Sequence, residues 1–214
     1  MSTATLPAPA PIEAARTDPL AVPLRLPARR YGRRTPLQSL SVTSVRCFEL
    51  CPEAFRRRYL LGERDPVGLS RVMGSVFGDV IAHYYQGQIK GQPLSEADVD
   101  NLVCKLFAAK IGEARLGPEE DAGLAKAQCR SGAASYLAEL APGIEPISVE
   151  RRASFRFCEE QEWRFVCYFD LECALEVPDL KFGRSSVRED RAARDLQATA
   201  YTYMRWAEGR PAIF

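Results

Sequence analysis

The spacing of apolar residues changes along the chain and divides it into a helical first half and a later part that begins with strands. Apolar residues recur at the spacing of one helical face between about residues 70 and 88: Val72, Val76, Val80 and Tyr84. Ser95 and Asp98 form a capping box, which predicts another helix through about residue 112. Further helices are predicted from Ser41 or Thr43 to Leu50, from Pro52 onward, and from Pro118 to Leu140.

After residue 140 the pattern becomes the alternation of apolar and polar positions that is typical of strands. Three stretches rich in β-branched or aromatic side chains alternate in this way: residues 147–157, 163–173 and 176–182. Ser186 and Glu189 form a capping box that predicts a last helix reaching about Glu208. Helices followed by strands and a closing helix predict an α/β domain whose sheet is covered on its faces.

The first 38 residues differ from the rest in composition. They are rich in proline and alanine and include a group of arginines: Arg29, Arg30, Arg33 and Arg34. Such a segment buries too little apolar surface to offset its ordering entropy, so residues 1–38 are predicted to be a disordered tail and residues 39–214 a folded domain. The arginines either contact phosphates or belong to a solvated tail. At the other end, residues 212–214 resemble the start of a strand, so we expect the domain to be truncated there.

Charge and cysteine content narrow the class of protein. The formal net charge is +1, so any binding of nucleic acid must come from local basic patches. The 7 cysteines include no Cys-x-x-Cys pair, and they fit free thiols in a reducing cytoplasm better than a disulfide framework. No apolar run approaches the roughly 20 residues that span a bilayer. We therefore expect a cytoplasmic protein that does not associate with membranes.

The candidate chemistry lies on the last two predicted strands. Asp170 is on the more polar side of one strand, and Asp179 and Lys181, two residues apart, share one face of the next. If these strands pair, two carboxylates and an ammonium group converge on one patch. Such a group can hold a hard divalent cation beside a water and a phosphate. The alternative is a solvated Asp–Lys pair on the surface of a strand.

Several motifs in a fixed order resemble those of the RecB-like nucleases of the PD-(D/E)xK superfamily, which include exonucleases of bacteria and phages. The matching positions are Ser41 to Val45 (SVTSV), Cys51 to Phe55 (CPEAF), Tyr59-Leu60, Met73 to Phe77 (MGSVF), Glu150, Asp170, Asp179-Leu180-Lys181, and Gln197 with Tyr201. Together they cover about residues 40–210.

The resemblance implies a restriction-endonuclease-like core, in which a central mixed β-sheet is flanked by helices and preceded by a helical N-terminal half. It also implies hydrolysis of DNA with Mg²⁺ or Mn²⁺, in recombination or repair, in a bacterium or a phage-infected host. Linear ends or single strands would be the substrate, with a helicase or recombinase as a further partner.

The resemblance also assigns roles to residues. Asp170 and Asp179, with the Leu180 carbonyl, would hold the metal, and Lys181 would orient or deprotonate the attacking water. Gln197 and Tyr201 would contact the DNA backbone near the scissile phosphate. The alternative for this pair is that Tyr201 packs on the sheet and Gln197 is solvated.

Outside these motifs, Arg57 and its arginine neighbours are a further candidate patch for phosphates, the alternative being a charged helix face.

The chain also departs from the family pattern. Gly78 stands where the family has a histidine, and His83 lies further round the helix. Either the helix is bulged, or Asp79 substitutes, or the site works without this ligand. His83 and Glu150 remain candidates for the site, with a surface or core histidine and a structural strand residue as the alternatives. Pro178 removes a ladder donor and predicts an edge strand or a bulge.

Two further hypotheses concern cofactor and activity. One branch of the family holds an iron–sulfur cluster with one early cysteine and three late ones. Cys47 or Cys51 fits the early position, but no cysteine follows Cys173, so no cluster is predicted. Beside an active nuclease, the alternatives are a catalytically weak or inactive nuclease fold that binds DNA or a partner, and an unrelated α/β regulatory domain.

Overall fold

A computed structural model describes residues 39–63, 65–158, 163–183 and 194–211. The predicted tail, residues 1–38, and the predicted capping box at Ser186 and Glu189 lie outside the described residues. The described part belongs to one unit, Thr35–Phe214. Its elements are β1 (Ser39–Leu40), α1 (Val42–Leu50), α2 (Pro52–Phe55), η1 (Arg56–Leu61), α3 (Leu69–Ile89), α4 (Glu96–Ile111), α5 (Ala122–Glu139), η2 (Ala141–Gly143), β2 (Ser148–Cys158), β3 (Trp163–Glu172) and α6 (Leu196–Ala207).

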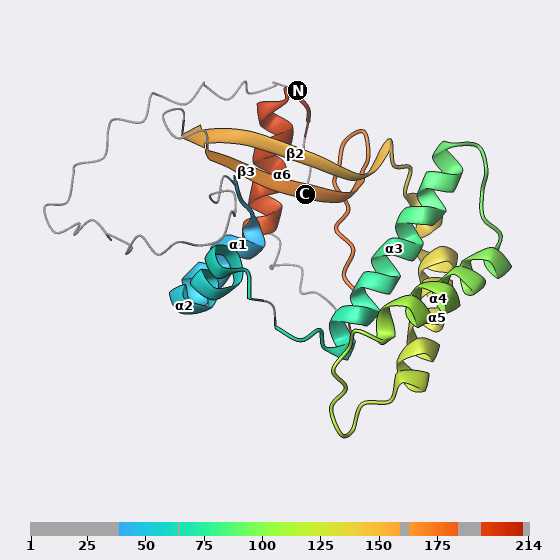
Figure 1. Ribbon diagram of the computed structural model, residues 1–214. Helices are drawn as coiled ribbons and strands as arrows, with labels where there is room; N and C mark the ends of the chain where they lie inside the picture. Colours follow the sequence, from blue (N-terminus) through green and yellow to red (C-terminus); the bar gives the residue numbers. More distant parts are fainter. Residues whose placement is uncertain (1–38, 64, 159–162, 184–193, 212–214) are drawn as a thin grey trace, which may run out of the picture. The chain divides into compact units, whose positions relative to one another are not determined.

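The sheet has the order β1-β3-β2 and is mixed, because β1 runs parallel to β3 and β2 runs antiparallel to it. Helix α6 runs across β2 and β3 (Figure 1) and packs on one face of the sheet. Cys167 and Phe169 on that face join Ala200, Tyr201 and Met204 of α6 in a buried cluster. The predicted fold class, a central mixed sheet flanked by helices with a helical N-terminal half, is confirmed.

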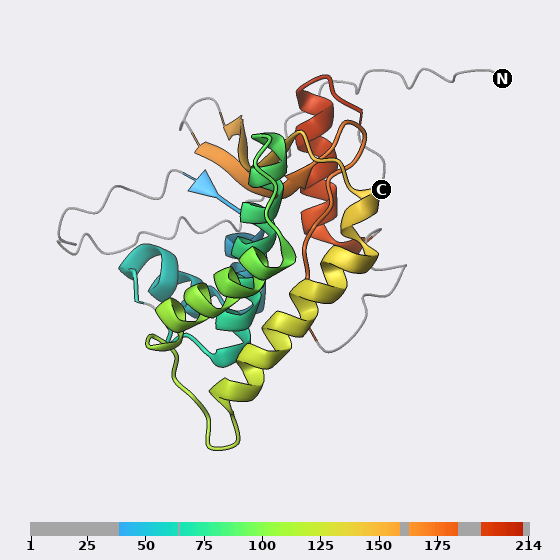
Figure 2. The ribbon, with the colours of Figure 1, turned by 90° about the vertical axis from the view of Figure 1, so that its right-hand side faces the viewer.

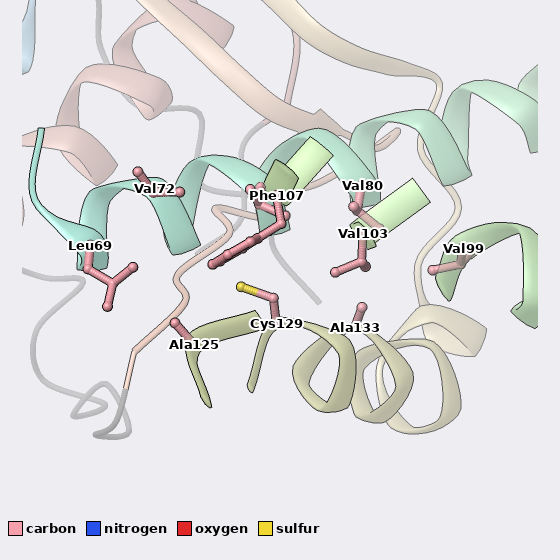
Figure 3. Close-up of a cluster of buried hydrophobic side chains, with 10 residues drawn as sticks. Leu69, Val72, Val80, Val99, Val103, Phe107, Ala125, Cys129 and Ala133 are labelled. Atoms are coloured by element: carbon pink, nitrogen blue, oxygen red, sulfur yellow. The ribbon is translucent and has the colours of Figure 1, made fainter. Parts of the chain in front are cut away.

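Helices α3, α4 and α5 form a second core (Figure 3). Val72, Val76 and Val80, three of the residues that predicted the long helix, are buried there. They meet residues of α4 and α5 that recur every four positions: Val99, Val103, Phe107, Ala125, Cys129 and Ala133. Each buried valine contributes roughly 1.5–3 kcal/mol relative to exposure, so this apolar stripe fixes the helix group.

The other side of α3 connects the helices to the sheet. Phe77, Ile81 and Tyr85 pack with Tyr136 of α5 and with Leu171 near the end of β3. The Tyr85 and Tyr136 hydroxyls hydrogen-bond each other at 3.1 Å inside this cluster. Helix α3 is therefore packed on both sides, which fixes the helix group beside the carboxyl end of β3.

Three predicted elements require correction. Residues 176–182 do not form the predicted strand: Pro178 has no amide donor, and the Leu180 amide bonds a carboxylate instead of a neighbouring strand. Helix α5 begins at Ala122 because the Asp121 carboxylate caps the amides of Gly123 and Leu124. The helix predicted from Pro52 changes to a π-helix at Arg56.

None of the described helices is long and apolar enough to cross a membrane.

Candidate active site

Asp170 lies at a point where the regular alternation of β2 and β3 is interrupted. Val149 pairs with Leu171, and Arg151 pairs with Phe169, so Glu150 stands opposite Asp170. Among the described non-glycine residues, only Glu150 has a positive φ, 50°. Phe169 packs toward α6, whereas Leu171 packs toward α3. The strand therefore turns its side chains at Asp170, between the two cores.

The segment after β3 returns to Asp170 without forming a ladder. The Leu180 amide donates a hydrogen bond to Asp170 Oδ2 at 2.9 Å. Lys181 Nζ lies 2.6 Å from Asp179 Oδ2, and the Lys181 side chain is half exposed. A single backbone amide thus fixes the place at which Asp170, Asp179 and Lys181 come together.

Gln197, on the first turn of α6, links this group to the helix. Its Nε2 donates to Asp179 Oδ1 at 2.9 Å, and its Oε1 accepts from Lys181 Nζ at 3.2 Å. Gln197 Nε2 also donates to the Tyr201 hydroxyl at 2.6 Å, and that hydroxyl donates to the Tyr168 carbonyl at 2.7 Å. Tyr201 is 3% exposed, and its ring packs on Phe169. Tyr201 therefore packs on the sheet, as one of the two alternatives has it, but Gln197 is held by Asp179 and Lys181 and is not the solvated residue of that alternative.

Phe182 anchors the same segment to the helix group. Its ring stacks on Phe77 of α3 with centroids 4.8 Å apart. It also lies so close to Gly132 of α5 that a methyl group there would overlap the ring. The absence of a side chain at Gly132 therefore allows Phe182 to insert between the helices and holds Lys181, its neighbour, in position.

The carboxyl of Asp170 is not electrostatically balanced by its surroundings. Burial raises its pKa to about 6, although the Leu180 amide opposes this shift. The nearby carboxylate of Asp179 adds to the rise, and Lys181 lowers the pKa. For comparison, burial also raises the pKa of the Tyr201 hydroxyl. Asp170 and Asp179 together thus form a pair of close carboxyls that a cation would relieve.

The donor set fits a small divalent cation. Two carboxylates are hard oxygen ligands, and Mg²⁺ characteristically uses one or two carboxylates together with waters and substrate phosphates. The Leu180 backbone, which meets Asp170, belongs to the same place. Within the ranges that the structure describes, no group of three or more histidine, cysteine or acidic side chains forms a closed metal cage. The site therefore fits an ion that keeps most of its coordination for water and substrate.

Other candidates from the sequence lie apart from this group. The His83 side chain is exposed, and its Nδ1 lies 2.7 Å from the Asp79 carbonyl of its own helix. Arg57 is exposed on η1 and pairs with Glu53 at 3.2 Å. Glu150 is opposite Asp170, but its side chain makes no hydrogen bond or ion pair with the other described residues. None of the three shares a hydrogen bond with the Asp170 group.

The position expected to carry the family's histidine is open. Helix α3 is continuous through Gly78, so a bulge, one of the three alternatives, is not present. Asp79 pairs with Lys110 of α4 and does not substitute for a ligand at the site. A Cβ at Gly78 would meet no described atom within 4 Å. Of the three alternatives, only a site without this ligand agrees with these contacts.

Two residues that support the start of α6 were not identified from the sequence. Asp195 caps α6 by accepting from the Gln197 amide at 2.7 Å, and Arg46 of α1 bonds the same carboxylate at 2.6 Å. These contacts set the direction of Gln197. An aspartate directly before a helix is a cap signal, but it was missed because the helix was predicted to start earlier, at Ser186.

A cleft of about 650 Å³ opens beside the site. Its floor carries Asp179, Lys181 and Gln197, and one wall is formed by Ser135 and Leu140 of α5. Figure 2 shows the end of α5 (yellow) and the start of α6 (orange-red) approaching each other at this edge. The Asp179 carboxylate and the Lys181 ammonium group are therefore accessible from a hollow that is large enough for part of a substrate.

The comparisons with known proteins agree with this geometry. A sequence model of the PD-(D/E)XK nuclease superfamily matches residues 39–212. No curated protein and no solved structure matched the chain. The match extends from β1 beyond the end of α6 and so includes every residue of the Asp170 group.

Proposed function

This chain belongs to the PD-(D/E)XK nuclease superfamily, and on that premise we propose that it is a metal-dependent DNA exonuclease of the RecB-like type. The observation that carries the proposal is the meeting of Asp170 and Asp179 at the Leu180 amide, with the pKa of Asp170 raised to about 6. A partly buried carboxyl beside a second carboxylate is a costly arrangement for folding alone, and it is typical of functional sites.

The residues of the site divide the work between them. Asp170, Asp179 and the Leu180 carbonyl would hold Mg²⁺ or Mn²⁺, which when bound supplies Lewis-acid activation of a phosphate and of a water. Lys181 has three N–H donors, of which two go to Asp179 and Gln197. The third remains for the attacking water or a phosphate oxygen, where the ammonium group stabilises growing negative charge.

Gln197 and Tyr201 have separate roles in this proposal, because Tyr201 acts only through Gln197. Gln197 holds both Asp179 and Lys181, and its exposed side can also meet the DNA backbone in the cleft. Tyr201 is buried and uses its hydroxyl on Gln197 and the Tyr168 carbonyl. We therefore assign Tyr201 the positioning of Gln197, and Gln197 any direct contact with DNA.

The setting of the activity is part of the same proposal. We place the protein in the cytoplasm of a bacterium or a phage-infected host, acting on linear ends or single strands in recombination or repair, beside a helicase or recombinase. The six described cysteines are free thiols, which supports a reducing compartment.

Digestion of labelled DNA tests the proposal. The protein is incubated with linear duplex, single-stranded and closed circular DNA, each with Mg²⁺, Mn²⁺ or EDTA. We expect digestion of linear DNA that requires the cation, spares the circle and is lost in Asp179→Asn and Lys181→Ala. Asp100→Asn, a change at an exposed aspartate of α4 that pairs with Arg130, serves as the control and should remain active. Cation-independent digestion, or activity that survives Asp179→Asn, contradicts the proposal.

Gly78 favours a second candidate function, a weak or inactive nuclease fold that binds DNA. No described atom would obstruct a side chain there, so the family's histidine is missing without steric reason. Gly78→His decides between the two. A large gain in cation-dependent digestion would show that the present chain is a weak nuclease, whereas salt-sensitive binding with no digestion by either protein supports the binding module.

A further inference from the structure

Four exposed residues lie on the face of β2 and β3 away from α6, on either side of the buried Val166 and its partner Ser154, and the proposed active site does not use them. Arg152 and Arg156 of β2 alternate with Ala153 and Phe155, whose side chains face α6. Arg164 and Tyr168 of β3 alternate in the same way with residues of the α6 cluster. Successive side chains of a strand point to opposite faces, so these four residues lie on the face away from α6. We call them the arginine face: Arg152, Arg156, Arg164 and Tyr168.

The register brings like charges together on this face. Arg156 is directly opposite Arg164, and Arg152 is directly opposite Tyr168. All three arginines are exposed, and no guanidinium group among them makes a hydrogen bond or ion pair with a described residue. Like charges opposite each other destabilise a sheet. An arrangement that weakens the fold and has no side-chain partner among the described residues is most simply explained by an external anion.

The anion that fits is the phosphate backbone of a nucleic acid. Guanidinium groups bind phosphates through paired hydrogen bonds. Arg152 and Arg156 are separated by about 13 Å along the strand, which is roughly the length of three or four nucleotides at about 3.4 Å each. Tyr168 is 58% exposed and offers an aromatic ring between the arginines and Asp170, two residues further along β3. A basic track with an aromatic side chain is the usual platform for single strands.

We propose that the arginine face binds the phosphate backbone of DNA outside the catalytic group, with a base stacked on Tyr168. The inference rests on the proposed function, because it takes DNA as the substrate. It adds a second contact region that holds the strand leading to or from Asp170. Since this region does not touch the reacting atoms, it should affect the affinity for DNA and not the rate of hydrolysis at saturation.

Binding measured without hydrolysis tests the inference. The full chain in EDTA is titrated against short fluorescent single-stranded and duplex oligonucleotides, and anisotropy is recorded at several salt concentrations. For the triple variant Arg152→Gln/Arg156→Gln/Arg164→Gln we expect at least a roughly tenfold loss of affinity, and a salt slope lower by about 2 for single strands and nearly 3 for duplex. Tyr168→Ala should lose roughly tenfold for single strands with the slope unchanged.

The matched control removes the same charge elsewhere. Lys90→Gln/Lys105→Gln/Arg115→Gln changes three exposed cations of the helix group, none paired with a described residue, and should retain the parental slope. Equal slopes for the two triple variants overturn the inference, as does a parent that binds no DNA. Melting temperature gives an independent reading: removal of like-charge contacts should leave it unchanged or raise it.

A competing explanation is that acidic residues of the same chain neutralise the arginines. The sequence that links β2 and β3 contains Glu159, Glu160 and Glu162, which lie outside the described residues. If these glutamates neutralise the arginines, the arginine-face variant will melt at a lower temperature and keep its DNA affinity, which also overturns the inference. The proposed nuclease can fail separately: arginine-dependent binding in EDTA, with no digestion under any cation, leaves this inference standing and removes only the activity.

Discussion

Asp170 and Glu172 lie two residues apart on β3, yet their carboxyl groups have opposite surroundings. Glu172 is 1% exposed and accepts hydrogen bonds from Arg151, Arg205 and Arg210 at 2.6–3.1 Å. Burial would raise its pKa, but Arg151, Ser148 and Arg210 more than offset this, and the pKa is lowered. Asp170 faces a second carboxylate and a half-exposed lysine, and its pKa is raised to about 6.

The difference separates a structural carboxylate from a functional one. Three arginines surround the single negative charge of Glu172. The carboxylate is therefore stable as an ion, and its pairing with Arg205 ties α6 to the sheet. Asp170 faces a second carboxylate and only one half-exposed lysine, so a bound cation would stabilise its ionised form, as we propose. Glu172 is buried and is held by arginines of β2 and α6.

The largest effect is expected for Asp170→Asn, which removes the carboxylate but keeps its shape. Hydrolysis of linear DNA should fall on the order of a thousandfold or more, because several kcal/mol of Lewis-acid stabilisation are lost with the cation. The melting temperature in EDTA should not fall. Rates are measured by release of labelled nucleotide with Mg²⁺. A variant that is inactive only because it unfolds would place Asp170 in the structural class instead.

Glu172→Gln should have the reverse profile and lose stability. It leaves the buried guanidinium of Arg205 without its carboxylate, and breaking a buried pair costs about 3–5 kcal/mol. Urea unfolding of parent and variant measures the loss. Glu119→Gln, at an exposed glutamate without a described partner, should unfold with the parent. Equal stability of Glu172→Gln and Glu119→Gln would show that the arginines around Glu172 do not need its charge.

The sequence predicted the residues of the site better than the means by which they meet. The sequence predicted that two paired strands would bring Asp170, Asp179 and Lys181 together. In the structure the second strand is absent, and one amide–carboxylate bond from Leu180 replaces it. Local patterns identify helices such as α3 and α4, whose caps and apolar stripes lie within the segment. They do not identify the partners of Glu172, because Arg151, Arg205 and Arg210 lie far from it in the sequence. Nor do they identify the fit of Phe182 against Gly132.

Gly132→Ala tests whether the Phe182 anchor matters to the site more than to the fold. The added methyl overlaps the ring and costs about 1–3 kcal/mol of strain, while alanine regains up to about 1 kcal/mol in a helix. We expect a modest loss of stability with a loss of activity of roughly tenfold, because a small displacement of Lys181 disturbs the reacting geometry. Gly78→Ala, where no described atom lies within 4 Å, is the matched control and should be stabilised and active. A smaller side chain in Phe182→Leu/Gly132→Ala should restore part of the activity, and no recovery would contradict the anchor.

The smallest effect expected is a pH dependence that distinguishes the two carboxyls by sign. Because the folded pKa of Asp170 is raised to about 6, the folded state keeps this proton where the unfolded chain, with a pKa of 3.8, has lost it. Its contribution to stability therefore falls as pH rises from about 4 to about 6. For Glu172, whose folded pKa is lowered, the contribution to stability is complete above pH 4.5 and is lost as pH falls.

The test compares the free energy of unfolding of Asp170→Asn with that of the parent in EDTA. Between pH 4 and pH 7 this free energy should rise for the variant relative to the parent by on the order of 1 kcal/mol, after allowance for solvent screening. Urea unfolding across this range measures the difference, and a parent that gains on Asp170→Asn as pH rises would mean that the Asp170 carboxylate is already balanced by the protein.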